Sequence, residues 1–97
     1  MVRLIRSMEA RLGLFPQAVA FAREIAGYVK GKYGVEPKVF ADSKGVVFWI
    51  VDYKDYAEFG EVRSKIASDE GYWEIVAKSE DLFITGTLVD EVVTAID

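Results

Sequence analysis

GVVFWIVDYK, residues 45–54, is the longest apolar run of the chain and is rich in β-branched and aromatic side chains. This composition predicts a central β-strand. Side chains of a strand point alternately to the two faces of a sheet, so Phe48 and Ile50 share one face while Trp49 and Val51 share the other. Both faces of the strand are therefore apolar, and each needs a cover.

The beginning of the chain predicts a strand followed by a helix. Residues 2–11 alternate between apolar and polar side chains, as a strand does, although Arg6 interrupts the apolar face. Pro16 suits the first turn of a helix, because its missing N–H would have no partner there. Residues 17–32 then carry apolar side chains at steps of three and four, which predicts an amphipathic helix.

Residues 35–42 predict a weaker strand that leads into the central one. Pro37 within it cannot donate a hydrogen bond to a neighbouring strand, so this strand is expected at an edge of the sheet. The polar turn Ser43-Lys44-Gly45 predicts a hairpin between the two strands.

Two acidic residues indicate where the later helices begin. Asp55 is followed three residues later by Glu58, which is the spacing of a capping box and predicts a second helix. The helical pattern is interrupted at residues 68–71 and restarts there, with Asp69 as a second N-cap.

The end of the chain has a less decisive pattern. Residues 82–86 predict a short fourth strand. In the tail that begins at residue 87, Leu88, Val92 and Ile96 fit a helical stripe, while the valines fit a strand equally well. We favour a short helix for this tail.

The order strand, helix, strand, strand, helix, strand predicts an α+β fold of the ferredoxin-like βαββαβ type. It has an antiparallel four-stranded sheet with both helices on one face. A chain of 97 residues is long enough for one core, so residues 1–97 are expected to form a single domain. Leaving the second apolar face in water would expose a larger patch than monomers usually tolerate. We expect a homodimer that packs the open faces together; the alternative is that the C-terminal tail folds back over its own sheet.

Composition excludes several classes of function. With 16 acidic against 12 basic residues, the net charge of -4 does not suit a nucleic-acid binder. The chain has no cysteine and no histidine, and its acidic pairs lack the spacing of a calcium loop, so we predict no metal site and no cofactor. No stretch approaches the roughly 18 apolar residues of a membrane span, and the first residues lack the pattern of a signal peptide. We therefore expect a soluble, cytoplasmic protein that binds no membrane.

Three stretches carry a resemblance to a known group of proteins: FWIVDYK at residues 48–54, DEGYW at 69–73 and DLFITGT at 81–87. With the order of the elements, they resemble small proteins of the dimeric α+β barrel superfamily, particularly NIPSNAP-like members, over nearly the whole chain. The resemblance implies a dimeric α+β barrel. It leaves the activity open, because the superfamily is implied to include cofactor-independent monooxygenases, haem-degrading enzymes, chlorite dismutase relatives and ligand-sensing regulators. The axial histidine of its haem enzymes has no counterpart in this chain.

In such a fold a ligand pocket lies between the sheet and the helices or the partner sheet, and it is mostly apolar with a few polar groups. The candidate ligand-binding residues are Arg6, Trp49, Asp52, Tyr53, Tyr72 and Trp73. A buried Arg6 needs a partner, which could be Asp52, Glu9 or an acidic ligand. The aromatic residues also suit a core or an interface, Tyr72 and Trp73 suit a lid, and Asp52 also suits a solvated rim.

No residue is identified as catalytic, because the strand faces are mostly aliphatic rather than lined by convergent polar groups. We therefore predict a homodimer that binds a small hydrophobic or aromatic molecule or acts as an accessory protein. The alternative is a cofactor-independent monooxygenase, in which the protein positions an activated aromatic substrate and supplies a proton acceptor.

Overall fold

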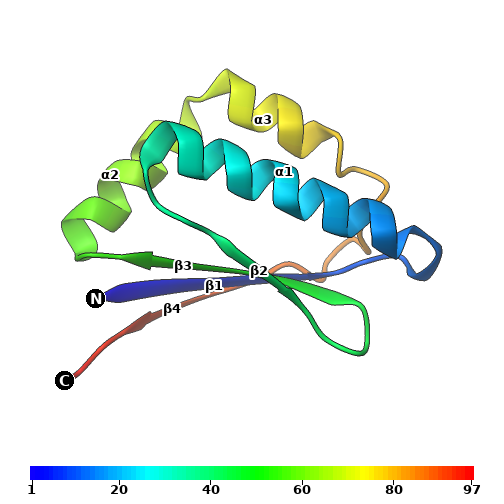
Figure 1. The fold of residues 1–97 in the computed structure, drawn as a ribbon, viewed down its shortest axis with the longest axis horizontal. Helices are drawn as coiled ribbons and strands as arrows, with labels where there is room; N and C mark the ends of the chain where they lie inside the picture. Colours follow the sequence, from blue (N-terminus) through cyan, green and yellow to red (C-terminus); the bar gives the residue numbers. More distant parts are fainter.

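The computed structural model describes residues 1–97 and shows a four-stranded antiparallel sheet with every helix on the same side of it (Figure 1). The strands are β1 (Val2–Glu9), β2 (Lys38–Ala41), β3 (Val46–Tyr53) and β4 (Val89–Thr94), in the order β2-β3-β1-β4 across the sheet. The helices are a 3-10 turn η1 (Leu12–Leu14), then α1 (Phe15–Tyr33), α2 (Tyr56–Ala67) and α3 (Glu70–Ala77). The predicted ferredoxin-like α+β fold is confirmed.

Strand β3 has the two-sided character that its sequence predicts. Its side chains alternate, with Trp49 and Val51 buried beneath the helices and Phe48 and Ile50 only partly buried on the opposite face. Strand β1 pairs with β3 along its whole length, and Val2 is among the most deeply buried side chains of the chain. The core therefore lies between the β1–β3 pair and the helices.

The helix boundaries follow the predicted signals. Pro16 stands in the first turn of α1, and Gly34 ends this helix in the left-handed conformation (φ 74°), donating its N–H to the Lys30 carbonyl. The Asp55 carboxylate accepts the N–H of Glu58 at the start of α2. The Asp69 carboxylate accepts the N–H of Tyr72 at the start of α3, which confirms the predicted break between these helices.

The C-terminal part differs from the prediction. Residues 82–86 form a loop rather than a strand, because Phe83 makes only an isolated bridge to Ala10 and Gly86 turns the chain at φ 86°. The tail predicted as a helix is strand β4, which pairs with the free edge of β1. Its β-branched side chains favour the extended conformation once a strand edge is available. Strand β1 also ends at Glu9, and β2 begins only at Lys38, inside the predicted ranges.

The sheet face turned away from the helices has no cover from this chain. Strand β4 lies in the plane of the sheet, so the alternative that the tail folds over this face is wrong. We call this surface the open face; its apolar side chains come from all four strands and are Ile5, Phe40, Val46, Phe48, Ile50, Val89 and Val93. Of these, Phe40 is 52% exposed and Val89 57% exposed. None of the helices combines the length and apolarity needed to cross a lipid bilayer.

Candidate functional site

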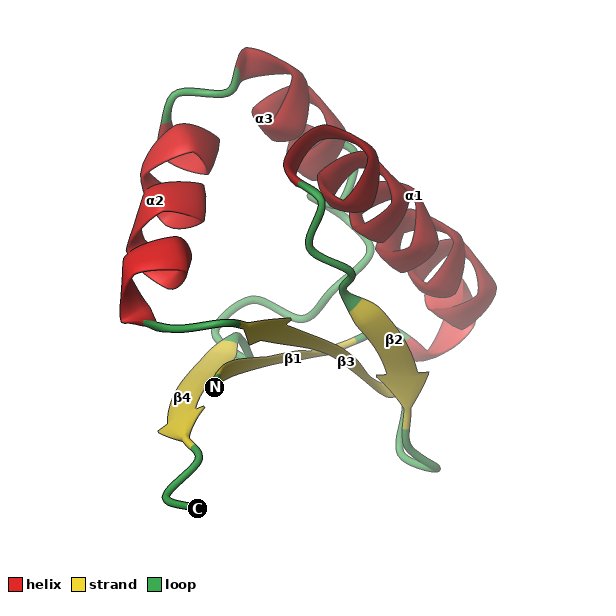
Figure 2. Ribbon diagram, turned by 60° about the vertical axis from the view of Figure 1, so that its left-hand side comes forward, coloured by secondary structure: helices red, strands yellow, loops and turns green.

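A cavity of about 380 Å³ lies between the helix-covered face of the sheet and the three α-helices. Figure 2 shows α2 standing apart from α1 and α3 above the sheet, and side chains from all of these elements line the cavity. Of its 19 lining residues 15 are hydrophobic, which is the character of a small-molecule site. The volume lies within the range of roughly 300 to 1,000 Å³ that such sites occupy.

Strand β3 supplies two aromatic walls of the cavity. The indole N–H of Trp49 donates to the Ala22 carbonyl of α1 at 3.3 Å, and its ring packs against the ring of Phe21. Tyr53 is buried, and this burial raises the pKa of its hydroxyl. Trp49 and Tyr53 both belong to the core and also line the cavity. The two roles that the sequence presented as alternatives, packing and a position at the site, therefore occur together.

Arg6 extends from β1 into the cavity and is paired with Asp90 of β4. The Nε and one Nη group of Arg6 donate to the two carboxylate oxygens at 2.7 and 2.8 Å. This two-point contact raises the pKa of Arg6 and lowers that of Asp90. The partners considered from the sequence, Asp52 and Glu9, are not the ones the fold provides, because the unexpected strand β4 places Asp90 directly opposite Arg6.

Asp52 lies on the open face and not in the cavity. It accepts two hydrogen bonds from Arg3 at 2.7 and 3.0 Å, and the Arg3 guanidinium lowers the pKa of its carboxyl. Of the candidate residues, the structure therefore brings Arg6, Trp49, Tyr53, Tyr72 and Trp73 together around the cavity and leaves Asp52 outside it.

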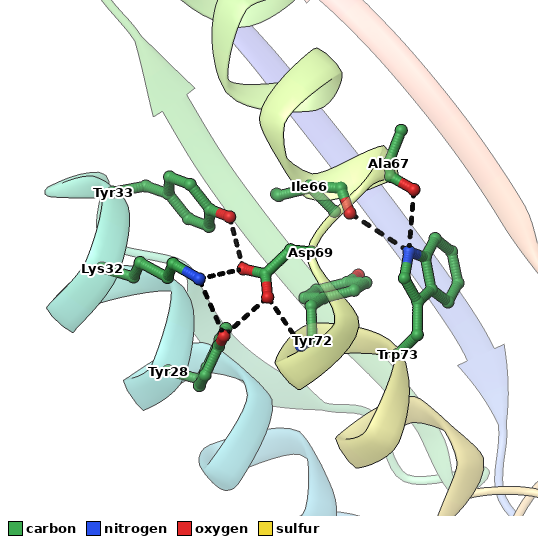
Figure 3. Close-up of polar contacts among 8 residues, drawn as sticks. All are labelled: Tyr28, Lys32, Tyr33, Ile66, Ala67, Asp69, Tyr72 and Trp73. Carbon is green, nitrogen blue, oxygen red and sulfur yellow. Dashed lines mark hydrogen bonds and ion pairs between the residues drawn. The ribbon is translucent and has the colours of Figure 1, made fainter.

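The corner between α2 and α3 supplies Tyr72 and Trp73 to the cavity. The Trp73 indole N–H donates to the carbonyls of Ile66 and Ala67 at the end of α2, and its ring meets that of Tyr72 edge-on at 5.1 Å (Figure 3). Trp73 therefore donates to the Ala67 carbonyl at the end of α2 and shares the Ile66 carbonyl with the Asp69 N–H. This contact fixes the angle between α2 and α3.

Asp69, at the same corner, joins α3 to the end of α1. Its buried carboxylate accepts hydrogen bonds from the hydroxyls of Tyr28 and Tyr33 and pairs with Lys32 at 3.0 Å (Figure 3). These donors stabilise the charged form and hold the pKa of Asp69 well below its usual range, with Tyr33 making the largest contribution. The cluster fixes the corner that forms one wall of the cavity.

Sequence reasoning missed two parts of this site. Arg63 of α2 lines the cavity although it is an exposed residue, and its guanidinium lies 5.3 Å from the centre of the Phe59 ring. The spacing of Phe59 and Arg63, one helical turn apart, is the signal that could have placed Arg63 beside the apolar stripe. Asp90 lay in a tail predicted as a helix, which hid its pairing with Arg6. No group of three or more acidic side chains comes together in a form that could hold a metal ion.

Replacing Arg6 by methionine is expected to lower the free energy of unfolding by about 2 kcal/mol, because Asp90 would lose its partner in a half-buried position. Chemical denaturation at pH 7 measures this. Lys78→Met is the matched control, because Lys78 pairs with Glu24 on the exposed surface, and a loss of less than about 1 kcal/mol is expected there. Equal losses in the two variants would show that the Arg6–Asp90 pair stabilises the fold no more than an exposed ion pair does.

These features define the class of protein: a ferredoxin-like α+β domain with one open sheet face and a mostly apolar cavity under its helices. No protein-family model matches the chain, and no curated protein matches it. Among solved structures, the chain is similar to an uncharacterised NIPSNAP domain protein from Burkholderia xenovorans, with 12% identity, a TM-score of 0.81 and coverage of 98% of this chain and 94% of that one. A NIPSNAP family protein from Agrobacterium tumefaciens has 15% identity and a TM-score of 0.79, with coverage of 99% and 93%.

A structure named antibiotic biosynthesis monooxygenase is similar as well, with 14% identity, a TM-score of 0.74 and full coverage of both chains. At these identities the likeness concerns the fold alone. It confirms the ferredoxin-like fold of the single chain, which this protein shares with the NIPSNAP domain structures and with the structure named a monooxygenase.

Proposed function

We propose that this protein is a cytoplasmic homodimer of single-domain subunits that binds a small hydrophobic or aromatic molecule in the cavity. The observation that carries the binding proposal is the cavity itself, with 15 hydrophobic side chains among its 19 lining residues and a few polar groups among them. Aromatic walls such as Trp49 and Tyr72 suit a planar ligand, against which they can stack. The homodimer follows from the open face, whose apolar side chains need a cover that this chain does not supply.

The binding proposal predicts that the uncharged dye N-phenyl-1-naphthylamine binds with micromolar affinity and that Ala67→Trp weakens this binding at least about 10-fold. Ala67 lines the cavity at the end of α2, so a larger side chain there takes up space that the dye needs. Fluorescence titration measures the affinity. Ala67 and Ala57 are both exposed positions of α2, but Ala57 does not line the cavity, so Ala57→Trp should leave the affinity unchanged.

Equal affinity in the wild-type protein and Ala67→Trp would place the dye elsewhere and refute the cavity as its site. The absence of any binding to the wild-type protein would refute the proposed function itself.

The second candidate is a cofactor-independent monooxygenase acting on an activated aromatic substrate. The observation that favours it is the fold shared with a structure of that name, together with two tyrosine hydroxyls at an apolar cavity. Asp52 lies on the open face and burial raises the pKa of Tyr53, so the tyrosine hydroxyls would position the substrate and the substrate itself would be the proton acceptor. Oxygen uptake with 1,4-dihydroxynaphthalene that exceeds the uncatalysed rate and is lost in Ala67→Trp would support this function. A rate equal to the uncatalysed rate, or equal in the wild-type protein and the variant, would oppose it.

A further inference from the structure

Charge is distributed unevenly around the cavity. The chain has a net charge of -4, yet the charged side chains that line the cavity are two arginines, Arg6 and Arg63. No aspartate or glutamate is among the lining residues. An acidic protein therefore presents positive charge to this mostly apolar cavity.

Arg6 is held in place and still has donors to offer. Its contact with Asp90 uses two of the five N–H groups of the guanidinium. The Asp90 carboxylate fixes the orientation of the planar group and balances its charge. Tyr72 also contributes to the raised pKa of Arg6, so at most three N–H groups of Arg6 are left to donate to Tyr72 or to a ligand at the edge of the cavity.

Arg63 is not a member of any of the six ion pairs of the chain, although Asp90 is near enough for the Arg63 charge to help lower the pKa of Asp90. The Arg63 guanidinium instead rests on the Phe59 ring, one turn earlier in the same helix, which is a weak cation–π contact for an exposed arginine. A flat cation that is in no ion pair is suited to two-point binding of a carboxylate or a similar oxygen group.

The two arginines act on the same part of the cavity. Burial raises the pKa of Tyr53, while the charges of Arg63 and Arg6 both oppose this rise. Arg63 also contributes to the low pKa of Asp90, after the larger effect of Arg6. Because such effects weaken with distance, the two cavity-lining arginines lie near Tyr53 and Asp90, while Glu58, which does not line the cavity, acts on Tyr53 with the opposite sign.

We propose that the ligand of this cavity is an amphipathic anion, a small molecule with an apolar or aromatic body and one acidic oxygen group such as a carboxylate. The apolar side chains would enclose the body, and Arg63, supported by Arg6, would bind the acidic group. Two arginines against one aspartate leave a net positive charge here, which favours such a ligand over its neutral analogue and disfavours a cation. This inference rests on the proposed function of the cavity and adds the charge of the ligand to it.

A pair of dyes with the same aromatic body tests this inference separately from the proposed function. N-phenyl-1-naphthylamine is uncharged, whereas 8-anilino-1-naphthalenesulfonate adds one sulfonate. We expect Arg63→Gln to weaken binding of the sulfonate dye about 10-fold, which corresponds to the loss of a charged hydrogen bond, and to change binding of the neutral dye less than about 2-fold. Fluorescence titration of both dyes, with circular dichroism to confirm the fold, gives these ratios.

Two further variants separate a specific contact from overall charge. Arg23→Gln removes the same charge from an exposed position of α1 that does not line the cavity, and it should change neither affinity more than about 2-fold at physiological salt. Arg63→Lys keeps the charge but loses the planar two-point donor, so it should weaken binding of the sulfonate dye less than Arg63→Gln does.

Equal weakening of both dyes by Arg63→Gln would show that Arg63 only packs the wall, and an unchanged sulfonate affinity would show that it does not meet the anion. Either result overturns the inference while leaving the binding function intact. Failure of both dyes to bind the wild-type protein refutes the proposed function instead.

Discussion

Phe48→Asp is expected to convert the protein from a dimer to a monomer. Phe48 lies in the middle of the open face, on the central strand β3 and opposite Phe40 of β2. In the proposed dimer, an aspartate at this position would be buried without a partner, which raises the dissociation constant by at least about 100-fold. Sedimentation equilibrium at micromolar concentration should give close to twice the chain mass of 10.9 kDa for the wild-type protein and the single chain mass for the variant.

The control for this experiment is Leu12→Asp. Leu12 is also an exposed apolar residue, 93% accessible in η1, but it is not on the open face. This variant should remain a dimer. A wild-type monomer would show that the open face is left uncovered, and a Phe48→Asp variant that dimerises as well as the wild type would place the interface on another surface.

Asp69→Ala is expected to cause the largest loss of thermal stability among single changes at the caps. The Asp69 carboxylate is the N-cap of α3 and also accepts the hydroxyls of Tyr28 and Tyr33 while pairing with Lys32. Its removal leaves several donors without a partner at once. The melting temperature at pH 7 and fixed protein concentration should fall at least about twice as far as in Asp55→Ala. Asp55 is the N-cap of α2 and the matched control, because its carboxylate caps that helix without a comparable cluster.

The contribution of Asp69 should also depend on pH. Its pKa is lowered in the folded protein, so its stabilising effect is complete above the unfolded value of about 4 and is lost as the pH falls below it. The difference in melting temperature between the wild-type protein and Asp69→Ala should therefore shrink below about pH 4. A difference that is constant from pH 7 to pH 3 would contradict a charged Asp69 at the centre of this cluster.

The parts of the fold that sequence predicts well are those with a local physical signal. The alternation along β3, the three- and four-residue steps of α1 and the caps at Asp55 and Asp69 each depend on residues close together in the chain. These signals sufficed for the ferredoxin-like order of elements. They also predicted the two apolar faces of β3, and the structure shows that this chain covers only one of them.

The parts that sequence could not predict depend on contacts between distant segments. The tail became a strand because β1 offers a free edge, and that pairing also decides that Arg6 meets Asp90 rather than Asp52. The sequence pattern of α2 indicates only that Arg63 is exposed. It lines a cavity because α2 stands apart from α1 in the folded chain. The charge of the site therefore became visible only in three dimensions, although its aromatic residues could be named from the sequence.

A crystal structure of the protein grown with N-phenyl-1-naphthylamine tests the central claim most directly, because it shows where an apolar molecule binds. We predict that the dye lies between the helix-covered face of the sheet and the α2–α3 corner, in contact with Trp49 and Tyr72. Dye bound only on the open face, or Trp49 and Tyr53 packed together with no space beside them, would contradict the claim that this cavity is a ligand site.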